Sequence, residues 1–452
     1  MTPEQITGLG PALAEFLGSF KNCFGECRLR DHFATYCRGL LSSLKRKTIE
    51  PIALAAGGTV RALQLFLSQR AWDHQRLCDQ LQQRVAARHG PAPGSARTPG
   101  DLGVIGLIDE TSVAKKGAKT PGVQRQYCGA SGKIDNCIVT VHLGYTRQVG
   151  AGHWAVLLDA DLYLPKVWAE DRARCTAADI PEDMVCRPKP AMALEQVRRA
   201  LANGVRFDWF VFDEGYGKDP SFLFGLDALG QTWIGEVPSN FRCWPTQPQC
   251  HSLRKEFASR QAYNVVRWSP AFIYQEWQTI AIPRQTVEPV TWDVKAAQVH
   301  LVHDGRPTDR TYWLIVAWNR ATGEHKYFVS NAPPHTDLGL LLRVAFHRAQ
   351  VEHLFRVAKD EVGLTHFEGQ SYVSLMRHMI LCQLVLLFLA ERAQHINAQR
   401  PVATPLPTAM RGEKDTGPAP ANITTTPAAA AHAAGNAGRD RPLPQLALYA
   451  LA

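Results

Sequence analysis

The 452-residue sequence contains no cysteine pair of the CxxC type. Its eleven cysteines are odd in number and scattered along the chain. This pattern is typical of reduced thiols in a cytoplasmic protein and argues against a disulfide framework. Two groups of metal-ligand residues lack the paired spacing of a structural zinc site, so we do not expect zinc there: Cys23, Cys27, His32 and Cys37, and Cys243, Cys250 and His251.

The sequence also lacks an unbroken apolar run of about 20 residues, the length that a membrane span needs. Its N-terminus, MTPEQITGLG, has neither the charged start nor the apolar centre of a signal peptide. We therefore expect no membrane contact and a cytoplasmic, nucleoid-associated protein. Basic residues outnumber acidic ones, with a net charge of +9, and residues 1–100 hold thirteen Lys or Arg against seven Asp or Glu. This excess makes a polyanionic partner worth testing.

A chain of this length predicts about three domains. Residues 1–88 carry apolar residues at helical spacing, which predicts a small helical domain. Its basic residues favour DNA binding, with a helix in the major groove and cations on phosphates. A solvated basic face on a structural domain is the alternative. The linker at 89–101, rich in proline and glycine, ends this domain.

Short apolar runs and helical segments alternate over residues 102–238, which predicts an α/β fold with a mixed sheet. The expected strands are 102–108, 137–145, 153–164, 207–212 and 232–237, with helices at 189–203 and 220–229. Residues 239–335 have the character of a β-rich insertion. Helices return over 336–392, including an apolar one at 376–390. The composition of 393–452 predicts a disordered tail.

Two aspartates each follow a run of apolar strand-forming residues. Asp109 comes after LGVIGLI, and Asp213 comes after FDWFVF. Either one alone is explained by a turn or a helix cap. In open α/β sheets, however, ligands bind at the carboxyl ends of the strands, so the two acids together favour a shared site.

The stretch 338–364 has the apolar spacing of one amphipathic helix, and Arg348, Glu352 and Lys359 lie on a single stripe of it. A salt-bridged surface would explain this stripe by itself. With the two aspartates, Glu352 would complete a carboxylate set of the kind that binds hard cations such as Mg²⁺. Two such ions about 4 Å apart activate the attacking oxygen and stabilise the leaving oxygen in phosphodiester chemistry.

Four segments together carry a family resemblance. They are IDET (108–111) with the glycine-rich stretch behind it, DLYLPKVWAEDRAR (161–174), FVFDEGYG (210–217), and the stretch 338–364. In the last, Arg348, Glu352 and Lys359 match the spacing Tyr-x2-Arg-x3-Glu-x6-Lys, with Ala345 in place of the tyrosine. Over about residues 15–392 the chain resembles an insertion-sequence transposase of the DDE superfamily.

The resemblance implies an RNase H-like mixed-sheet core at 102–238 and 336–392, interrupted by the β-rich insertion and preceded by the helical domain. It implies that Asp109, Asp213 and Glu352 are the catalytic, metal-binding triad, with two Mg²⁺ ions, or Mn²⁺. Metal-activated water would cut each transposon end, and the freed 3′-hydroxyl would join target DNA by transesterification. Double-stranded DNA and a second copy of the chain would be the partners.

The same resemblance gives Arg348 and Lys359 the task of holding DNA phosphates. Further candidates for DNA contact lie in the first hairpin of the core, although a solvated loop explains them equally well: Lys115, Lys116, Arg125 and Lys133. The tryptophans of the insertion are expected in the core, with one of them free to stack on a base: Trp244, Trp268, Trp277 and Trp292.

Two other functions fit the same sequence. One is an inactive or domesticated relative that binds DNA as a regulator, and the other is a stand-alone RNase H-like nuclease. The intact acidic triad argues against the regulator, while the basic helical segment and the insertion argue against the simple nuclease. Inverted repeats beside the coding region would favour a mobile element.

Overall fold

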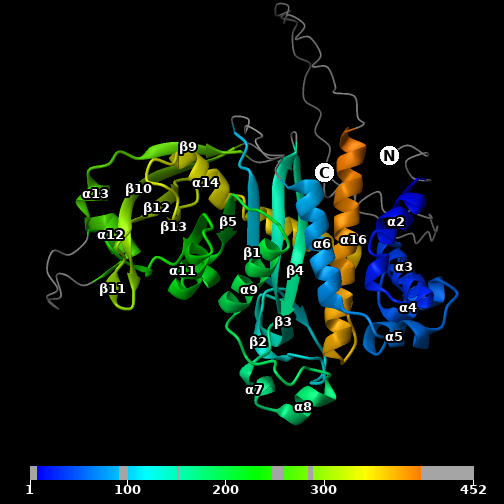
Figure 1. The fold of residues 1–452 in the computed structure, drawn as a ribbon. Coiled ribbons are helices and arrows are strands. Elements are labelled where there is room, and N and C mark those ends of the chain that lie inside the picture. Colours follow the sequence, from blue (N-terminus) through cyan, green and yellow to red (C-terminus); the bar gives the residue numbers. More distant parts are fainter. Residues whose placement is uncertain (1–7, 91–99, 150–151, 247–258, 284–288, 399–452) are drawn as a thin grey trace, which may run out of the picture.

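The computed structural model describes residues 8–90, 100–149, 152–246, 259–283 and 289–398. The N-terminal part is helical. Figure 1 shows its first four helices on one side of a long helix, α16 (Tyr372–Ala398), and its last helix on the other side, next to the sheet. Its helices are α2 (Leu9–Gly18), α3 (Cys27–Leu41), α4 (Ile49–Ala55), α5 (Val60–Ser68) and α6 (His74–His89). A short 3₁₀ turn, Lys21–Cys23, follows α2.

Helix α6 shows how the sequence determines these elements. Asp73 caps its N-terminus by accepting a hydrogen bond from the Gln75 backbone N–H at 2.8 Å. Leu77, Leu81 and Val85 follow at four-residue spacing and are all fully buried. The N-terminal helices and the sheet bury one continuous apolar cluster with α16, so the helical segment is packed onto the core.

The core sheet begins with three antiparallel strands, β1 (Val104–Ala114), β3 (Lys133–Val149) and β4 (Gly152–Leu162). On the other edge of β1, the strands β5 (Trp209–Phe212) and β6 (Trp233–Val237) are parallel to it. The order β4-β3-β1-β5-β6 is that of an RNase H-like fold. Close packing on this sheet requires Gly106, because a Cβ there would lie 2.4 Å from the Phe210 ring.

Helices connect and cover these strands. Between β4 and β5 lie α7 (Lys166–Ala169), α8 (Arg172–Ala177) and α9 (Lys189–Ala202), and between β5 and β6 lie α10 (Glu214–Gly217) and α11 (Pro220–Ala228). Helix α9 packs against β3 and β4, while α16 packs against β4 and against α3, α5 and α6. The expected order of strands and helices over 102–238 is confirmed, with the bounds shifted by a few residues.

The segment between β6 and the C-terminal helices continues the same sheet. Strand β13 (Glu324–Ser330) pairs with β6 and with β12 (Tyr312–Asn319), which pairs with β10 (Val290–His303). The remaining elements of this segment are β7 (Arg242–Trp244), β8 (Arg260–Gln261), α12 (Ala262–Trp268), α13 (Pro270–Ile273), β9 (Gln278–Ile282) and β11 (Arg306–Pro307). Of the tryptophans noted above, Trp292 is buried, whereas Trp268 is 60% exposed.

The single helix expected over 338–364 is wrong. The chain forms α14 (Leu338–Phe346), a turn at His347, α15 (Ala349–Val357) and a π-helical turn, Ala358–Val362. The buried His347 side chain lies against Thr146 and the His153 ring, where the chain changes direction. Helix α14 then packs on β6 and β9, and α15 packs on β1 and β4. Both helices have apolar faces, so the apolar spacing that predicted one helix continues across the turn at His347.

Helix α16 is longer than the 15 residues expected at 376–390, and it includes 393–398, which the sequence assigned to the tail. The rest of the expected tail lies outside the described residues, as does most of the linker. By length and composition the segment Tyr372–Asn397 is apolar enough to cross a membrane, contrary to the sequence reading. However, 94% of its most apolar stretch is buried inside the protein, so it is the central core helix.

Arg377 ties α16 to the N-terminal helices, and its loss should destabilise the fold. Its guanidinium donates hydrogen bonds to the carbonyls of Phe66, Leu67, Arg70 and Trp72 at the end of α5. Arg377→Met removes these four hydrogen bonds, although the Phe66 and Arg70 carbonyls keep donors from Trp72. We expect the free energy of unfolding to fall by about 3 kcal/mol in urea denaturation. Arg392→Met on the same helix is the control, and an equal loss in both variants would contradict this role.

Candidate catalytic carboxylate site

Asp109 and Asp213 lie on neighbouring parallel strands. Leu107 of β1 is paired with Val211 of β5, so two residues further along each chain the two aspartates are adjacent. Strand β5 ends at Phe212, but β1 continues to Ala114, so Asp109 lies within its strand and not at the expected end. Asp213 caps α10 by accepting a hydrogen bond from the Gly215 N–H at 2.9 Å. The capping explanation is therefore confirmed for Asp213, and the strand register also places Asp213 beside Asp109.

The Asp109 carboxyl group is difficult to ionise. Its side chain is only 13% exposed. Burial, with the nearby Asp213 charge as the next cause, raises the pKa of Asp109 to about 7. The Glu110 backbone N–H, which donates to Asp109 Oδ1 at 2.7 Å, and the Arg348 guanidinium act in the opposite direction. The fold therefore places Asp109 and Asp213 side by side although this disfavours the ionised form of Asp109.

Arg348 connects the third predicted acid to this pair. It precedes α15, and its Nη1 atom lies 3.1 Å from Asp109 Oδ2, while its Nη2 atom lies 3.2 Å from Glu352 Oε1. The Glu352 side chain is 67% exposed and extends from the first turn of α15. In the described part of the chain, no three His, Cys, Asp or Glu side chains are close enough to hold one metal ion. The guanidinium therefore lies between the two carboxylates.

Lys359 also faces Asp109. Burial lowers the pKa of Lys359, and the Asp360 and Asp109 charges oppose that shift. Its ammonium lies 5.6 Å from the centre of the Phe355 ring. Of the predicted stripe, Arg348 contacts both Asp109 and Glu352, and Lys359 interacts electrostatically with Asp109. The stripe spans a helix start and a π-helical turn.

The sequence reading missed His142, which is paired with Asp109 across β1 and β3. Cross-strand partners point to the same face of a sheet, and His142 is fully buried there, 5.1 Å from the Phe355 ring centre. Burial, with a smaller contribution from Lys359, lowers the pKa of His142 to about 3, so it stays neutral. Only the strand register identifies this residue, because no sequence motif contains it.

Glu110 faces the other side of the sheet, as expected from the alternation along β1. Its Oε1 atom lies 2.6 Å from the Lys189 Nζ atom of α9. The buried Tyr216 hydroxyl is also close, and the pKa of Tyr216 is raised, first by burial and then by the charges of Glu110, Asp109 and Asp213. Tyr216 is therefore a further residue of the site that the sequence reading quoted without a role.

The four candidates for DNA contact fall into two groups. The Lys115 ammonium donates to the Phe367 carbonyl and lies over that ring, and burial lowers the pKa of Lys115 to about 8. Lys115 therefore holds the segment after α15, and its ammonium is not exposed for DNA. Lys116, Arg125 and Lys133 are exposed around the hairpin of β2 (Gln124–Cys128) and β3.

The basic N-terminal segment offers less free charge than its sequence suggests. Arg84 makes two hydrogen bonds to Glu391 of α16, at 2.8 and 2.7 Å, and so fixes α6 to the core.

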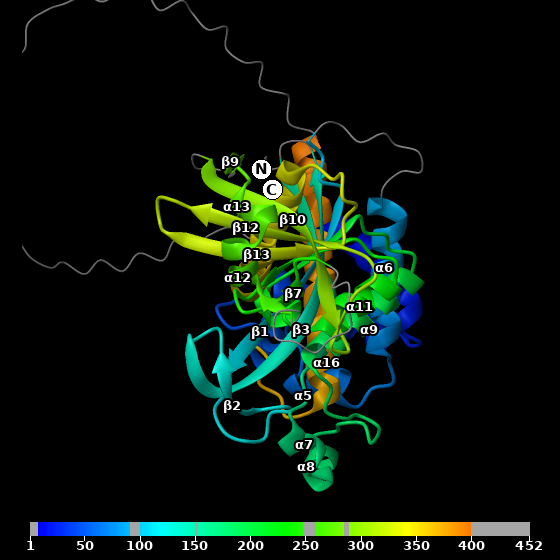
Figure 2. The same cartoon turned by 90° about the vertical axis from the view of Figure 1, so that its left-hand side faces the viewer.

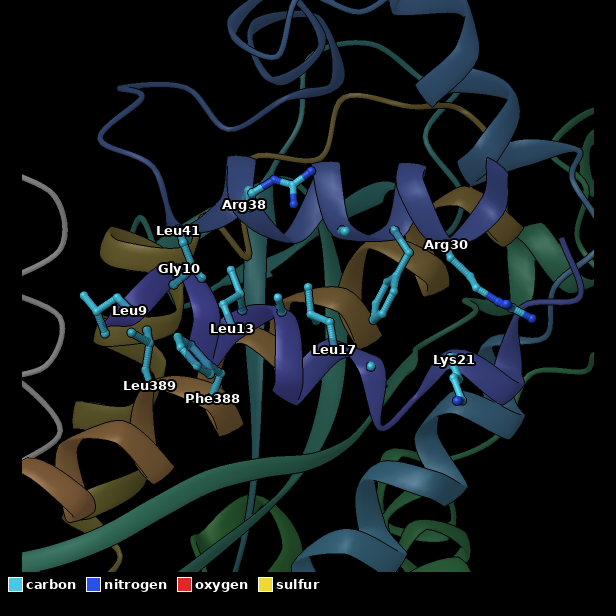
Figure 3. Close-up of a pocket in the computed structure, with 14 residues that line it drawn as sticks. Leu9, Gly10, Leu13, Leu17, Lys21, Arg30, Arg38, Leu41, Phe388 and Leu389 are labelled. Carbon is cyan, nitrogen blue, oxygen red and sulfur yellow. The ribbon is translucent and has the colours of Figure 1, made fainter. Parts of the chain in front are cut away.

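An apolar groove lies between α2, α3 and α16 (Figure 3) and has a volume of about 470 Å³. None of its lining residues belongs to the carboxylate site. Of the cysteines noted above, Cys23 and Cys37 are buried, and Cys250 lies outside the described residues.

Comparison with known proteins identifies the family. A family model described as DDE superfamily endonuclease matches residues 19–298, which is more than half of the chain. The chain belongs to the DDE superfamily of endonucleases. The matched region contains Asp109 and Asp213 and ends before Glu352, which Arg348 connects to Asp109.

A probable transposase for insertion sequence element IS701 from Microchaete diplosiphon is 31% identical over 228 residues. The aligned region is 50% of this chain and 53% of that protein, so the chain spans about half the length of this relative. A solved piggyBac transposase synaptic complex with hairpin DNA is 9% identical, with a TM-score of 0.37, over 82% of this chain and 67% of that chain. The likeness of this DDE endonuclease to insertion-sequence transposases is thus confirmed.

The raised pKa of Asp109 predicts a pH-dependent stability. Asp109 ionises near pH 7 in the folded protein but near pH 4 in the unfolded chain. The wild type therefore loses stability relative to Asp109→Asn as the pH rises from about 4 to about 7. At pH 8 we expect the variant to be more stable by on the order of 3 kcal/mol, measured by urea denaturation with a chelator present.

The control for this measurement is Asp183→Asn, which changes an exposed aspartate. Its stability difference from wild type should be small and independent of pH. If the stability difference between Asp109→Asn and wild type stays the same from pH 4 to pH 8, the Asp109 carboxyl group is not buried and repelled as we describe.

Proposed function

We propose that this DDE endonuclease is a transposase that cuts the ends of an insertion sequence and joins the 3′-hydroxyl ends to target DNA. The observation that supports this most is the adjacency of Asp109 and Asp213, with Glu352 connected to them by Arg348. Double-stranded DNA is the proposed partner, with two copies of the chain on paired ends, in the cytoplasm at the nucleoid.

The acids fit a divalent cation. The proposed donors are carboxylate oxygens only, which is the donor set that Mg²⁺ or Mn²⁺ prefers. Asp109 is buried beside a second carboxylate, and a cation bound by both would offset the repulsion that raises its pKa. Asp109, Asp213 and Glu352 would hold two ions, which activate the attacking oxygen and stabilise the leaving one.

The basic side chains have a second task in this proposal. Glu352 is exposed on the first turn of α15, so its side chain is free to rotate toward the aspartates. With Asp109 and Glu352 engaged by a cation, the Arg348 guanidinium would be free to hold a DNA phosphate in a bidentate manner. Lys359 provides a second positive charge on the same face. Ala345 is buried in α14 and offers no hydroxyl group, so phosphate binding falls to Arg348 and Lys359.

A cleavage and strand-transfer assay tests the function. The substrate is a duplex carrying the element's own ends, with Mg²⁺, and the proteins are wild type and Glu352→Gln. Because a metal ligand contributes several kcal/mol to the transition state, we expect about a thousandfold loss of cutting. Equal cutting by both proteins would refute the triad. Binding of the ends without cutting by the wild type would favour a regulator, and cutting without joining would favour a nuclease.

A binding measurement tests the task of Arg348. Without DNA, its guanidinium competes with a cation for Asp109 and Glu352, so Arg348→Gln should bind Mn²⁺ roughly tenfold more tightly in calorimetry. The same variant should bind the DNA ends less tightly. Arg356→Gln is the matched control, because Arg356 lies on the exposed side of α15 and contacts His353. Unchanged or weaker Mn²⁺ binding by Arg348→Gln would refute the competition.

A further inference from the structure

The hairpin of β2 and β3 projects from the sheet beyond the carboxylates. β3 pairs with β1 from Cys137 to Arg147, with His142 opposite Asp109. Strand β2 pairs with residues 133–137 of β3. These pairs lie beyond the end of the β1–β3 pairing, in the direction in which β1 runs past Asp109. Figure 2 shows β2 extending away from α16 and the N-terminal helices. The hairpin is therefore placed to meet a DNA molecule whose cleaved phosphate lies at Asp109.

The two faces of this hairpin differ. On one face, Cys128 and Cys137 are fully buried, and the Gln126 side chain donates to the Cys137 carbonyl at 3.0 Å. On the other face, Tyr127 is 66% exposed and Ile134 is 63% exposed. These two residues are direct cross-strand partners, so they form one apolar pair on the surface. A firmly packed inner face thus presents a hydrophobic outer face to the solvent.

Positive charge surrounds this pair. Arg125 is exposed and lies two residues before Tyr127, on the same face of β2. Residues 115–137 contain four lysines and one arginine against a single aspartate. Such an excess favours a polyanion as the partner and opposes contact with another basic surface, including a second copy of the same hairpin. Exposed apolar side chains among cations are what DNA-bending proteins insert between base pairs.

We infer that the outer face of the β2–β3 hairpin inserts Tyr127 and Ile134 into the DNA roughly 26 Å from the cleaved phosphate, the rise of the eight residues of β3 from His142 to Ile134. Arg125 on the same face and Lys133 at the start of β3 contact nearby phosphates. A two-stranded ribbon is narrow enough to enter a DNA groove. Unstacking a base step there would bend the DNA and fix its position relative to Asp109 and Asp213. This inference deepens the proposed function and rests on it for the identity of the DNA.

The test uses duplexes of the element's own end, with 2-aminopurine at successive positions out to about ten base pairs on either side of the cleavage point. Glu352→Gln protein keeps the DNA uncut. We expect a several-fold rise in 2-aminopurine fluorescence on binding at one or two positions, because the base there is unstacked. With Tyr127→Ala and Ile134→Ala added, the rise should be lost, and cutting by the otherwise wild-type double variant should slow by about tenfold.

Two controls accompany this test. Val167→Ala with Val185→Ala removes two other exposed apolar side chains and should leave the fluorescence rise intact. Arg125→Ala with Lys133→Ala should instead reduce the salt dependence of binding by about two phosphate contacts. Circular dichroism melting shows whether each variant is folded, and the buried Cys128 and Cys137 of the hairpin are unchanged in all of them.

Three results would overturn the inference. They are an unchanged fluorescence rise in Tyr127→Ala/Ile134→Ala, no rise at any position with the parent protein, and a loss of self-association without DNA in that variant, measured by light scattering. The last result would make the hairpin a contact between protein chains. Failure of the wild type to cut, with the fluorescence rise retained, would refute the proposed function and leave the inference standing.

Discussion

The parallel pairing of β1 with β5 is the constraint on which the site depends. Three pairs of residues, from Ile105 with Trp209 to Leu107 with Val211, fix the register of two strands that are far apart in sequence. That register places Asp109 beside Asp213. Because side chains alternate across a sheet, a slip of one residue would turn Asp109 toward the opposite face, where Glu110 pairs with Lys189. The buried apolar residues of both strands make such a slip costly.

This pairing also creates an electrostatic problem that the surrounding residues reduce. Burial of Asp109 raises its pKa, and the charge of the neighbouring half-buried Asp213 raises it further. Arg348 offsets part of the negative charge, and Lys359 approaches from the same helical segment. Arg348 lies at the break between α14 and α15, whereas Lys359 lies in the π-helical turn that follows α15. A straight helix could not pack on β6 and β9 with one half and on β1 and β4 with the other. The break therefore lets both helices pack on the sheet and also places Arg348 next to Asp109.

The rest of the molecule holds these strands in place. Helix α16 fills the space between the sheet and the N-terminal helices, and its polar side chains have buried partners, such as the carbonyls bound by Arg377. On the other side, β13 continues the sheet from β6, so the insertion is joined to the core by backbone hydrogen bonds. The site therefore lies at the middle of a continuous sheet, where relative movement of its strands is restricted.

The sequence by itself determined the local elements and the chemical character of the site. Apolar runs before Asp109 and Asp213 predicted β1 and β5, and the spacing of Arg348, Glu352 and Lys359 predicted that they act together. These are properties of neighbours in the chain, where periodicity and residue type suffice. It did not determine that β1 continues past Asp109, that α14 and α15 are separate, or that α16 is a full-length core helix.

Only the tertiary structure decided what each charged side chain contacts. It assigned Lys115 to the Phe367 carbonyl and Arg84 to Glu391, and it left Tyr127 and Ile134 exposed on the hairpin. The carboxylate set, with Arg348 between Asp109 and Glu352, joins residues more than two hundred positions apart. Such contacts follow from strand register and helix packing. Because these depend on the whole chain, the contacts cannot be predicted from the local sequence.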